Sequence, residues 1–265
     1  MKVVILAGGL GTRLSEETQI LPKPMVKIGG KPILWHIMKI YSHYGHNDFI
    51  ICCGYKGEII KEYFSNYFLN NSDVTFDLRN NQMRVHQNRS EPWSVTLVDT
   101  GPDTMTGGRL KRVRDYIGNE TFHLTYCDII TDVNLDKLLL YHKSQNTLAT
   151  LTAVQKPGRF GAFFLHEEQN RIHKFHEKPV RHNEWINSGY FVLEPKIFDY
   201  IEGDQTTWEH EPLDALAGEG QLSAFRHGGF FQTMDTLKEK NLLEEIWNSG
   251  NCPWKTWDSK VVPHQ

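Results

Sequence analysis

A glycine-rich segment near the start of the chain has the residue types that bind phosphate. Residues 6–13 read LAGGLGTR and follow an apolar run. Three glycines within four positions let backbone N–H groups approach a phosphate or a base edge, because no side chain stands in the way. Arg13 adds a planar guanidinium, and Lys23, within Pro22-Lys23-Pro24, adds a compact ammonium. The spacing predicts a site for a nucleotide polyphosphate.

Two familiar glycine motifs are excluded by the same residues. The pattern G-x-G-x-x-G would use Gly9 and Gly11, but Leu14 stands where the third glycine is required, and no acidic residue follows about 20 positions on. No G-x-x-x-x-G-K-[ST] occurs either. The sequence therefore argues against a nicotinamide oxidoreductase and a P-loop enzyme. A structural glycine turn with two solvated cations is the alternative interpretation.

Two aspartates stand at the ends of predicted strands. Asp128 closely follows the predicted buried strand 123–126, and Asp235 follows residues 230–234 and precedes a helix. Carboxylates at strand ends can meet at one edge of an α/β sheet, where they suit a hydrated Mg²⁺ that bridges phosphate oxygens. We expect Asp128 and Asp235 to form a metal site. The alternative for Asp235 is a helix-capping role beside Thr236.

The composition limits the class of protein. The chain has 265 residues, of which 39% are hydrophobic and 23% charged, as in ordinary folded domains and unlike disordered chains. Lys and Arg total 29 against 32 Asp and Glu, so the net charge of -3 lacks the basic field of a nucleic-acid binder. An anionic ligand must then be bound by a local site.

The cysteines and the apolar runs indicate the compartment of the protein. Four cysteines without a CxxC pair indicate reduced thiols rather than a zinc site or a disulfide framework. No apolar run is long enough to span a membrane. The apolar residues 3–7 run into glycine and Arg13 too soon for a signal peptide, so they are predicted to form a buried strand. We expect a cytoplasmic protein with no membrane partner.

Apolar runs rich in β-branched residues alternate with helical patterns, which is typical of α/β folds with a mainly parallel sheet. The predicted strands are residues 3–7, 49–53, 96–99, 123–126, 148–154, 163–166, 171–175 and 190–193. The predicted helices begin at residue 32, cover 57–68 and 134–144, and begin again at 236. Thr236 and Glu239 form a capping-box pattern, and Gly250 stands at the expected C-terminal position of that last helix. Polar residues 70–89 predict a hairpin.

The motifs resemble those of the sugar nucleotidyltransferases, a family of enzymes that join a nucleoside triphosphate to a sugar 1-phosphate. Within that family the chain is similar to the cytidylyltransferases that act on glucose 1-phosphate. The segments that carry this similarity, in order along nearly the whole chain, are VKIGGKPILWHIMKIYSHYG, DFIICCGYKG, SVTLVDTG, MTGGRLKR, PGRFGA, MDTLKEK and PWKTW. The resemblance implies Mg²⁺-assisted attack of the sugar phosphate on the α-phosphorus of CTP, which yields a CDP-sugar and pyrophosphate by positioning and charge neutralisation.

The resemblance also implies a role for individual residues. The catalytic residues would be Arg13, on the β and γ phosphates, and Lys23, on the α-phosphate. Arg109 could bond the cytosine carbonyl, although an ordinary turn is the competing interpretation of Gly107 and Gly108. The nucleotide-binding residues would be Leu6, Ala7, Gly8, Gly9, Gly11, Thr12, Arg13, Lys23, Thr104, Gly108 and Arg109. The sugar-phosphate-binding residues would be Lys178, Asn187 and Gly189, and the metal ligands Asp128 and Asp235.

The resemblance implies a Rossmann-like α/β fold in which a mixed, mainly parallel sheet is flanked by helices. One nucleotidyltransferase domain would span residues 1–265, and the protein would be a homo-oligomer. Residues 1–130 would bind mainly the nucleotide, a β-rich portion at 131–235 laid over the first would bind mainly the sugar, and 236–265 would form a C-terminal helix and tail.

The chain departs from the family at three positions where glycine is usual, namely Cys127, Ile129 and Ser188. Bulkier neighbours of a sugar pocket can change the sugar that is accepted. Another sugar 1-phosphate, or UTP or dTTP in place of CTP, therefore remains open. A nucleotide-binding regulator without turnover is the alternative from a different class.

Overall fold

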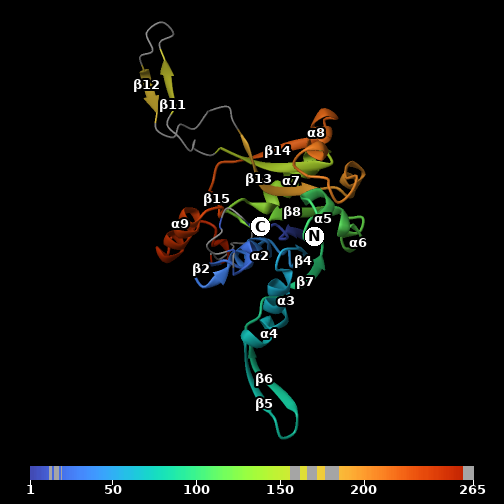
Figure 1. Cartoon of the computed structure of the whole chain (residues 1–265), viewed down its shortest axis with the longest axis vertical. Helices are drawn as coiled ribbons and strands as arrows, with labels where there is room; N and C mark the ends of the chain where they lie inside the picture. Colours follow the sequence, from blue (N-terminus) through green and yellow to red (C-terminus); the bar gives the residue numbers. More distant parts are fainter. Residues whose placement is uncertain are drawn as a thin grey trace, which may run out of the picture.

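The structure is a computed structural model that describes residues 1–11, 14, 18, 20–155, 162–165, 172–176 and 185–258. A mixed sheet of seven strands forms its centre (Figure 1). In chain order these strands are β1 (Lys2–Leu6), β4 (Asp48–Cys53), β7 (Ser94–Asp99), β8 (Phe122–Tyr126), β10 (Ala149–Val154), β13 (Ile186–Leu193) and β14 (Leu222–His227).

The order of the strands across the sheet is β14-β10-β13-β8-β1-β4-β7. Strand β1 pairs in parallel with β4 and β8, β4 pairs in parallel with β7, and β10 pairs in parallel with β14. Strand β13 is antiparallel to both of its neighbours, β8 and β10. The predicted mixed, mainly parallel sheet is thus confirmed.

Helices flank both faces of this sheet. They are α2 (Ile33–His43), α3 (Gly57–Ser65), α4 (Tyr67–Asn70), α5 (Thr106–Arg112), α6 (Arg114–Ile117), α7 (Leu135–Gln145), α8 (Glu211–Gly218) and α9 (Leu237–Asn248), with 3-10 turns η2 (Lys23–Met25), η3 (Pro195–Tyr200) and η4 (Thr256–Asp258). Successive side chains of a strand point to opposite faces. Val3 and Ile5 of β1 accordingly join one buried cluster with α2, α7 and α9, whereas Val4 and Leu6 join another with α5, α6 and α8.

Four pairs of short strands complete the fold. They are β2 (Lys27–Ile28) with β3 (Lys31–Pro32), β5 (Ser72–Asp77) with β6 (Gln82–Asn88), β9 (Ile129–Thr131) with β15 (Phe231–Thr233), and β11 (Ala162–Leu165) with β12 (Ile172–His176). The β5–β6 pair is the predicted hairpin, and it extends away from the sheet in Figure 1. None of the helices in the described residues is long and apolar enough to span a bilayer.

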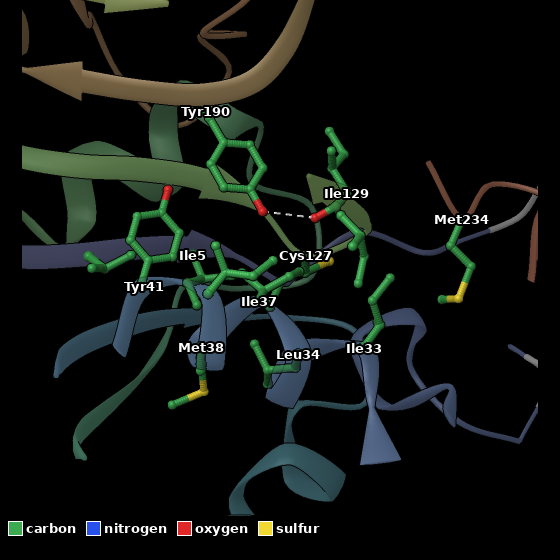
Figure 2. Close-up of a cluster of buried hydrophobic side chains, with 14 of the residues drawn as sticks. Ile5, Ile33, Leu34, Ile37, Met38, Tyr41, Cys127, Ile129, Tyr190 and Met234 are labelled. Atoms are coloured by element: carbon green, nitrogen blue, oxygen red, sulfur yellow. Dashed lines mark hydrogen bonds between the residues drawn. The ribbon is translucent and has the colours of Figure 1, made fainter. Parts of the chain in front are cut away.

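Helix α2 packs its apolar side against the segments that carry the candidate metal ligands (Figure 2). Cys127, Ile129 and Met234 all lie in the same buried cluster as α2, and the Tyr190 hydroxyl donates to the Ile129 carbonyl at 3.1 Å. Complete burial of one isoleucine or methionine side chain contributes about 2 kcal/mol to the free energy of folding. The core therefore fixes the chain on both sides of Asp128.

Helix α9 folds as the sequence predicts. The Thr236 side chain accepts from the Glu239 backbone N–H, and the Glu239 carboxylate accepts from the Thr236 backbone N–H, which is the predicted capping box. Gly250 follows helix α9 with φ of +75°, a conformation that glycine adopts without strain.

The β-rich second half differs from its prediction. It was expected to lie over the first half, but β13, β10 and β14 instead continue the same sheet beyond β8. The reason is the antiparallel pairing of β13 with β8, which extends the sheet sideways. Local sequence patterns predict a strand but do not specify its partner.

Candidate active site

A cavity of about 890 Å³ opens where the parallel strands β1 and β8 end. Its walls are the loop after β1, the segment 102–106 after β7, residues 126–129 at the end of β8, and Asn187 of β13. Ligands of open α/β sheets bind outside the carboxyl ends of the strands. The predicted glycine loop and the predicted metal carboxylates therefore face one cavity.

Asp128, Asp235 and Lys23 meet in this cavity. The Lys23 ammonium lies 2.5 Å from Oδ2 of Asp128 and 2.6 Å from Oδ1 of Asp235. Pairing of β15 with β9 brings the two carboxylates together, since the Met234 N–H donates to the Asp128 carbonyl at 2.9 Å. The Asp235 N–H donates to the Glu239 carboxylate at 2.8 Å, which fixes it at the start of α9. The predicted meeting of the two aspartates occurs.

Lys23 is held as an ammonium although it is almost fully buried. Its residue is 8% exposed. Burial lowers the pKa of Lys23, but the Asp128 and Asp235 carboxylates raise it, and the net direction is upward. The ammonium thus lies between two carboxylates that come from different parts of the chain.

The glycine loop brings its backbone close to a second cation. A Cβ atom at Gly8 would lie 2.1 Å from Nη1 of Arg109, so only glycine fits between this guanidinium and the loop. Gly11 has φ of +65° and passes close to Thr18 and the Lys23 side chain. The loop is also tied to β4 and the chain beyond it, because Ala7 N–H donates to the Cys52 carbonyl at 3.1 Å. These contacts show that the glycines allow the loop to pass close to Arg109 and Lys23.

Arg109 organises the wall of the cavity after β7. It is 5% exposed, and its guanidinium donates to Oγ1 of Thr100 and to the carbonyls of Cys53, Gly101 and Pro102 at 2.7 to 3.3 Å. Burial lowers the pKa of Arg109, whose ordinary value is nevertheless so high that it stays charged. Its side chain therefore joins the end of β4, the loop after β7 and the glycine loop.

The two glycines before Arg109 have a different role from the one proposed for them. Gly107 and Gly108 lie in helix α5, not in a turn, and neither lines the cavity. A Cβ atom at Gly107 would lie 2.7 Å from the Thr206 carbonyl oxygen, and one at Gly108 would lie 2.5 Å from Cα of Asp204. They allow close approach of the segment 204–206 to the helix.

The opposite wall carries Asn187 and Gly189. Asn187 lines the cavity, and its Oδ1 accepts from the Gly189 N–H at 2.8 Å. Gly189 has φ of +79°, and a Cβ there would lie 2.3 Å from the Tyr126 ring. Ser188 is fully buried, and its Oγ has no hydrogen-bond partner among the described residues.

Cys127 follows β8 and lines the cavity. Burial raises the pKa of its thiol to about 12.

The predicted residues thus divide into three groups. Those lining the cavity are Leu6, Gly8, Gly9, Gly11, Lys23, Thr104, Arg109, Asp128, Asn187 and Asp235. Those near it that do not line it are Ala7, Gly108 and Gly189. Those outside the described residues are Thr12, Arg13 and Lys178.

Tyr126 and Glu209 line the cavity and were not predicted. The Tyr126 hydroxyl donates to Oε1 of Glu209. Tyr126 could have been suspected because it stands two residues before Asp128. Glu209 belongs to no recognisable motif, so its place follows only from the fold.

This combination of fold and site is that of an enzyme that handles a nucleoside triphosphate. A family model described as nucleotidyl transferase matches residues 2–217. The chain therefore belongs to the nucleotidyl transferase family.

Curated relatives narrow the comparison. Glucose-1-phosphate cytidylyltransferase from Salmonella typhi is 58% identical over 259 residues, which are 97% of this chain and 100% of that protein. Probable glucose-1-phosphate cytidylyltransferase from Bacillus subtilis is 47% identical over 260 residues, which are 97% and 100% of the two chains. These matches confirm the resemblance to the glucose-1-phosphate cytidylyltransferases that the sequence motifs indicated.

Solved structures have the same fold. HddC from Yersinia pseudotuberculosis superimposes with a TM-score of 0.67 at 25% identity, covering 93% of this chain and 99% of that one. A UDP-glucose pyrophosphorylase complexed with UDP-glucose gives a TM-score of 0.66 at 18% identity, covering 94% and 99%. The predicted nucleotidyltransferase fold is thereby confirmed.

Proposed function

We propose that this chain transfers the cytidylyl group of CTP to α-D-glucose 1-phosphate, which gives CDP-glucose and pyrophosphate. The relatives that are 58% and 47% identical are named for this activity. The observation that carries the proposal is the cluster of Lys23, Asp128 and Asp235 beside the glycine loop. A cation suited to phosphate and two carboxylates suited to a metal line the same cavity, which supports the proposal.

Asp128 and Asp235 would hold Mg²⁺. This ion keeps several waters and binds proteins through one or two carboxylates together with substrate phosphates. The cluster fits that requirement, because it offers two adjacent carboxylates. When bound, Mg²⁺ would neutralise part of the triphosphate charge.

Lys23 would change partners when the substrate binds. Its ammonium bridges the carboxylates proposed to hold the metal. We propose that Lys23 leaves them as CTP binds, and would then bind the α-phosphate, where negative charge develops. Arg13 would bind the β and γ phosphates, and Lys178 would bind the sugar phosphate.

The protein would otherwise act by aligning glucose 1-phosphate with the α-phosphorus of CTP. A phosphate oxygen of glucose 1-phosphate forms a bond to the α-phosphorus of CTP, and the bond from that phosphorus to pyrophosphate breaks. No protein nucleophile is needed. Cys127 lines the cavity, but burial raises the pKa of its thiol to about 12, so it stays protonated.

The nucleoside and the sugar would occupy opposite walls. Thr104, Arg109 and the glycine loop lie on the side of β1, β4 and β7, and we assign the nucleoside to them. Asn187 lies on β13, beyond β8, and we assign the sugar to that side. Gly189 would act indirectly, because its missing side chain leaves room for the Tyr126 ring.

The test is release of pyrophosphate from CTP, Mg²⁺ and glucose 1-phosphate, crossed with UTP, dTTP and other sugar 1-phosphates. We expect the highest kcat/KM with CTP and glucose 1-phosphate. No release with any combination would contradict the proposal, and tight CTP binding without release would favour a regulator. A higher kcat/KM with another pair would keep the reaction class but change the substrate.

We also propose that the enzyme is a cytoplasmic homo-oligomer. Its substrates, CTP and a sugar 1-phosphate, are cytoplasmic metabolites, and the cysteines within the described residues are not paired in disulfides. Sedimentation of the purified chain at several concentrations tests the oligomer, and a monomer at all concentrations would contradict it.

A further inference from the structure

A chain of directed hydrogen bonds connects the wall of the cavity beside β13 to Thr106 at the start of α5. The Gly189 N–H donates to Oδ1 of Asn187 at 2.8 Å. The Asn187 side chain also interacts with the Tyr126 hydroxyl. That hydroxyl donates to Oε1 of Glu209, and Oγ1 of Thr106 donates to Oε2 of Glu209 at 2.6 Å. The chain therefore ends on the Glu209 carboxylate.

The directions of these bonds follow from the donors available. A tyrosine hydroxyl has one proton to give, and here it is donated to Glu209. The backbone N–H of Trp208 donates to Oγ1 of Thr106 at 2.9 Å, so the threonine hydroxyl proton is directed towards Glu209 as well. The network thus holds the carboxylate in one orientation.

Glu209 keeps capacity for a ligand. An ionised carboxylate has about four acceptor sites, and the hydroxyls of Tyr126 and Thr106 fill two of them. It lines the cavity and is only partly buried. A carboxylate repels phosphate, so the group it accepts from must belong to a neutral part of the substrate.

The positions of Tyr126 and Asn187 within the sheet favour a contact of Glu209 with the sugar rather than with the cytosine base. Tyr126 ends β8 and Asn187 lies on β13, which are on the opposite side of β1 from β4 and β7. We infer that Glu209 is a specificity-determining residue that accepts hydrogen bonds from hydroxyl groups of the sugar 1-phosphate, with Tyr126 and Thr106 as its positioning residues. This inference rests on the proposed function.

The test compares Glu209→Gln with the wild-type enzyme. The substrates are glucose 1-phosphate and analogues that each lack one hydroxyl group, all at saturating CTP. A site built to hydrogen-bond a hydroxyl rejects the analogue without it. We expect the wild type to disfavour at least one analogue by about tenfold or more in kcat/KM. In Glu209→Gln this ratio should fall to about two, the KM for glucose 1-phosphate should rise about tenfold, and the KM for CTP should stay within about twofold.

Glu211→Gln is the matched control, because Glu211 is an exposed acid two residues further on that does not line the cavity. It should behave as the wild type. Tyr126→Phe removes one positioning hydroxyl and should lower the same ratio in part. This second variant answers the question if Glu209→Gln loses its folded state in a thermal melt.

Three results would overturn the inference. They are an unchanged ratio in Glu209→Gln, an equal loss for every analogue, and a rise in the KM for CTP in place of that for the sugar. The last result would indicate that Glu209 contacts the cytosine base, whose amino group is also a hydrogen-bond donor. If the wild type itself releases no pyrophosphate, the proposed function fails; if it does while the ratio is unchanged, only the role of Glu209 fails.

Discussion

Replacement of Lys23 by methionine should tighten metal binding in the absence of nucleotide while it lowers turnover. In the unliganded enzyme the Lys23 ammonium lies 2.5 and 2.6 Å from the two carboxylates proposed to bind Mg²⁺. A metal ion that binds alone must displace this ammonium. Methionine has a similar length and no charge, so the variant removes the competing cation and keeps most of the packing.

The magnitude follows from the burial of the cluster. Loss of one partner of a buried ion pair costs about 3 to 5 kcal/mol. The Asp128 side chain is 21% exposed, so solvent screens part of this interaction; we therefore take about 2 to 3 kcal/mol. Each 1.4 kcal/mol is tenfold, which gives about 30- to 150-fold tighter metal binding in Lys23→Met. Loss of a charge that stabilises the transition state should lower kcat about 10²- to 10³-fold.

The assay is titration of each protein with Mn²⁺ or Mg²⁺, followed by calorimetry, first without nucleotide and then with a non-reactive CTP analogue. Lys27→Met is the control, because Lys27 is exposed on β2 and should bind metal as the wild type does. Equal or weaker metal binding by Lys23→Met without nucleotide would refute the idea that Lys23 competes with the metal. Circular dichroism checks that the variant is folded.

Three further outcomes are expected. Asp235→Asn should weaken metal binding more than tenfold and raise the Mg²⁺ concentration needed for turnover, because one ligand is lost while Lys23 keeps its other partner; an unchanged Mg²⁺ requirement would contradict this. Gly8→Ala should raise the KM for CTP about tenfold, because its Cβ would lie 2.1 Å from the Arg109 guanidinium; Gly203→Ala, which meets nothing within 4 Å, is its control. The free energy of unfolding should fall by about 3 kcal/mol through His36 as the pH is lowered from 6.5 to 4, because burial lowers the pKa of His36 to about 4 in the folded state. Urea unfolding at a series of pH values should show a smaller loss in His36→Gln, and equal loss in the two proteins would exclude His36 as the cause.

The sign of the His36 effect follows from its contacts. In the folded state Nε2 lies 2.8 Å from the Ile28 carbonyl oxygen, and Nδ1 accepts from the Trp254 indole N–H at 3.4 Å. The ring is therefore neutral when folded, whereas in the unfolded chain it takes up a proton near pH 6.5. This contribution to stability is complete above that pH and is lost as the pH falls towards 4.

Elements with a strong local pattern were predictable from the sequence. The strand at Val3, the strand at Phe49 and the helix capped by Thr236 lie where the apolar period and the capping residues place them. The helix α5 was not predicted, because Gly107 and Gly108 have low helix propensity. Its formation depends on close packing against the segment 204–206, which is remote in the sequence.

The candidate site was likewise predictable only in part. The meeting of Asp128 and Asp235 was predictable, because each follows a strand and strand ends gather at one edge of the sheet. The direct ion pairs of Lys23 with both were not, since the sequence does not show which charge reaches which. Glu209 was missed for a similar reason: the residue that orients it, Tyr126, is 83 positions away along the chain.

The continuous sheet sets the distance between the two walls of the cavity. The glycine loop extends from β1, and Asn187 stands on β13, which is separated from β1 only by β8. Neighbouring strands lie about 4.8 Å apart, so the two walls are offset by two spacings, or about 10 Å. No hinge between halves is needed to set this separation, because hydrogen bonds between strands that run through both halves fix it.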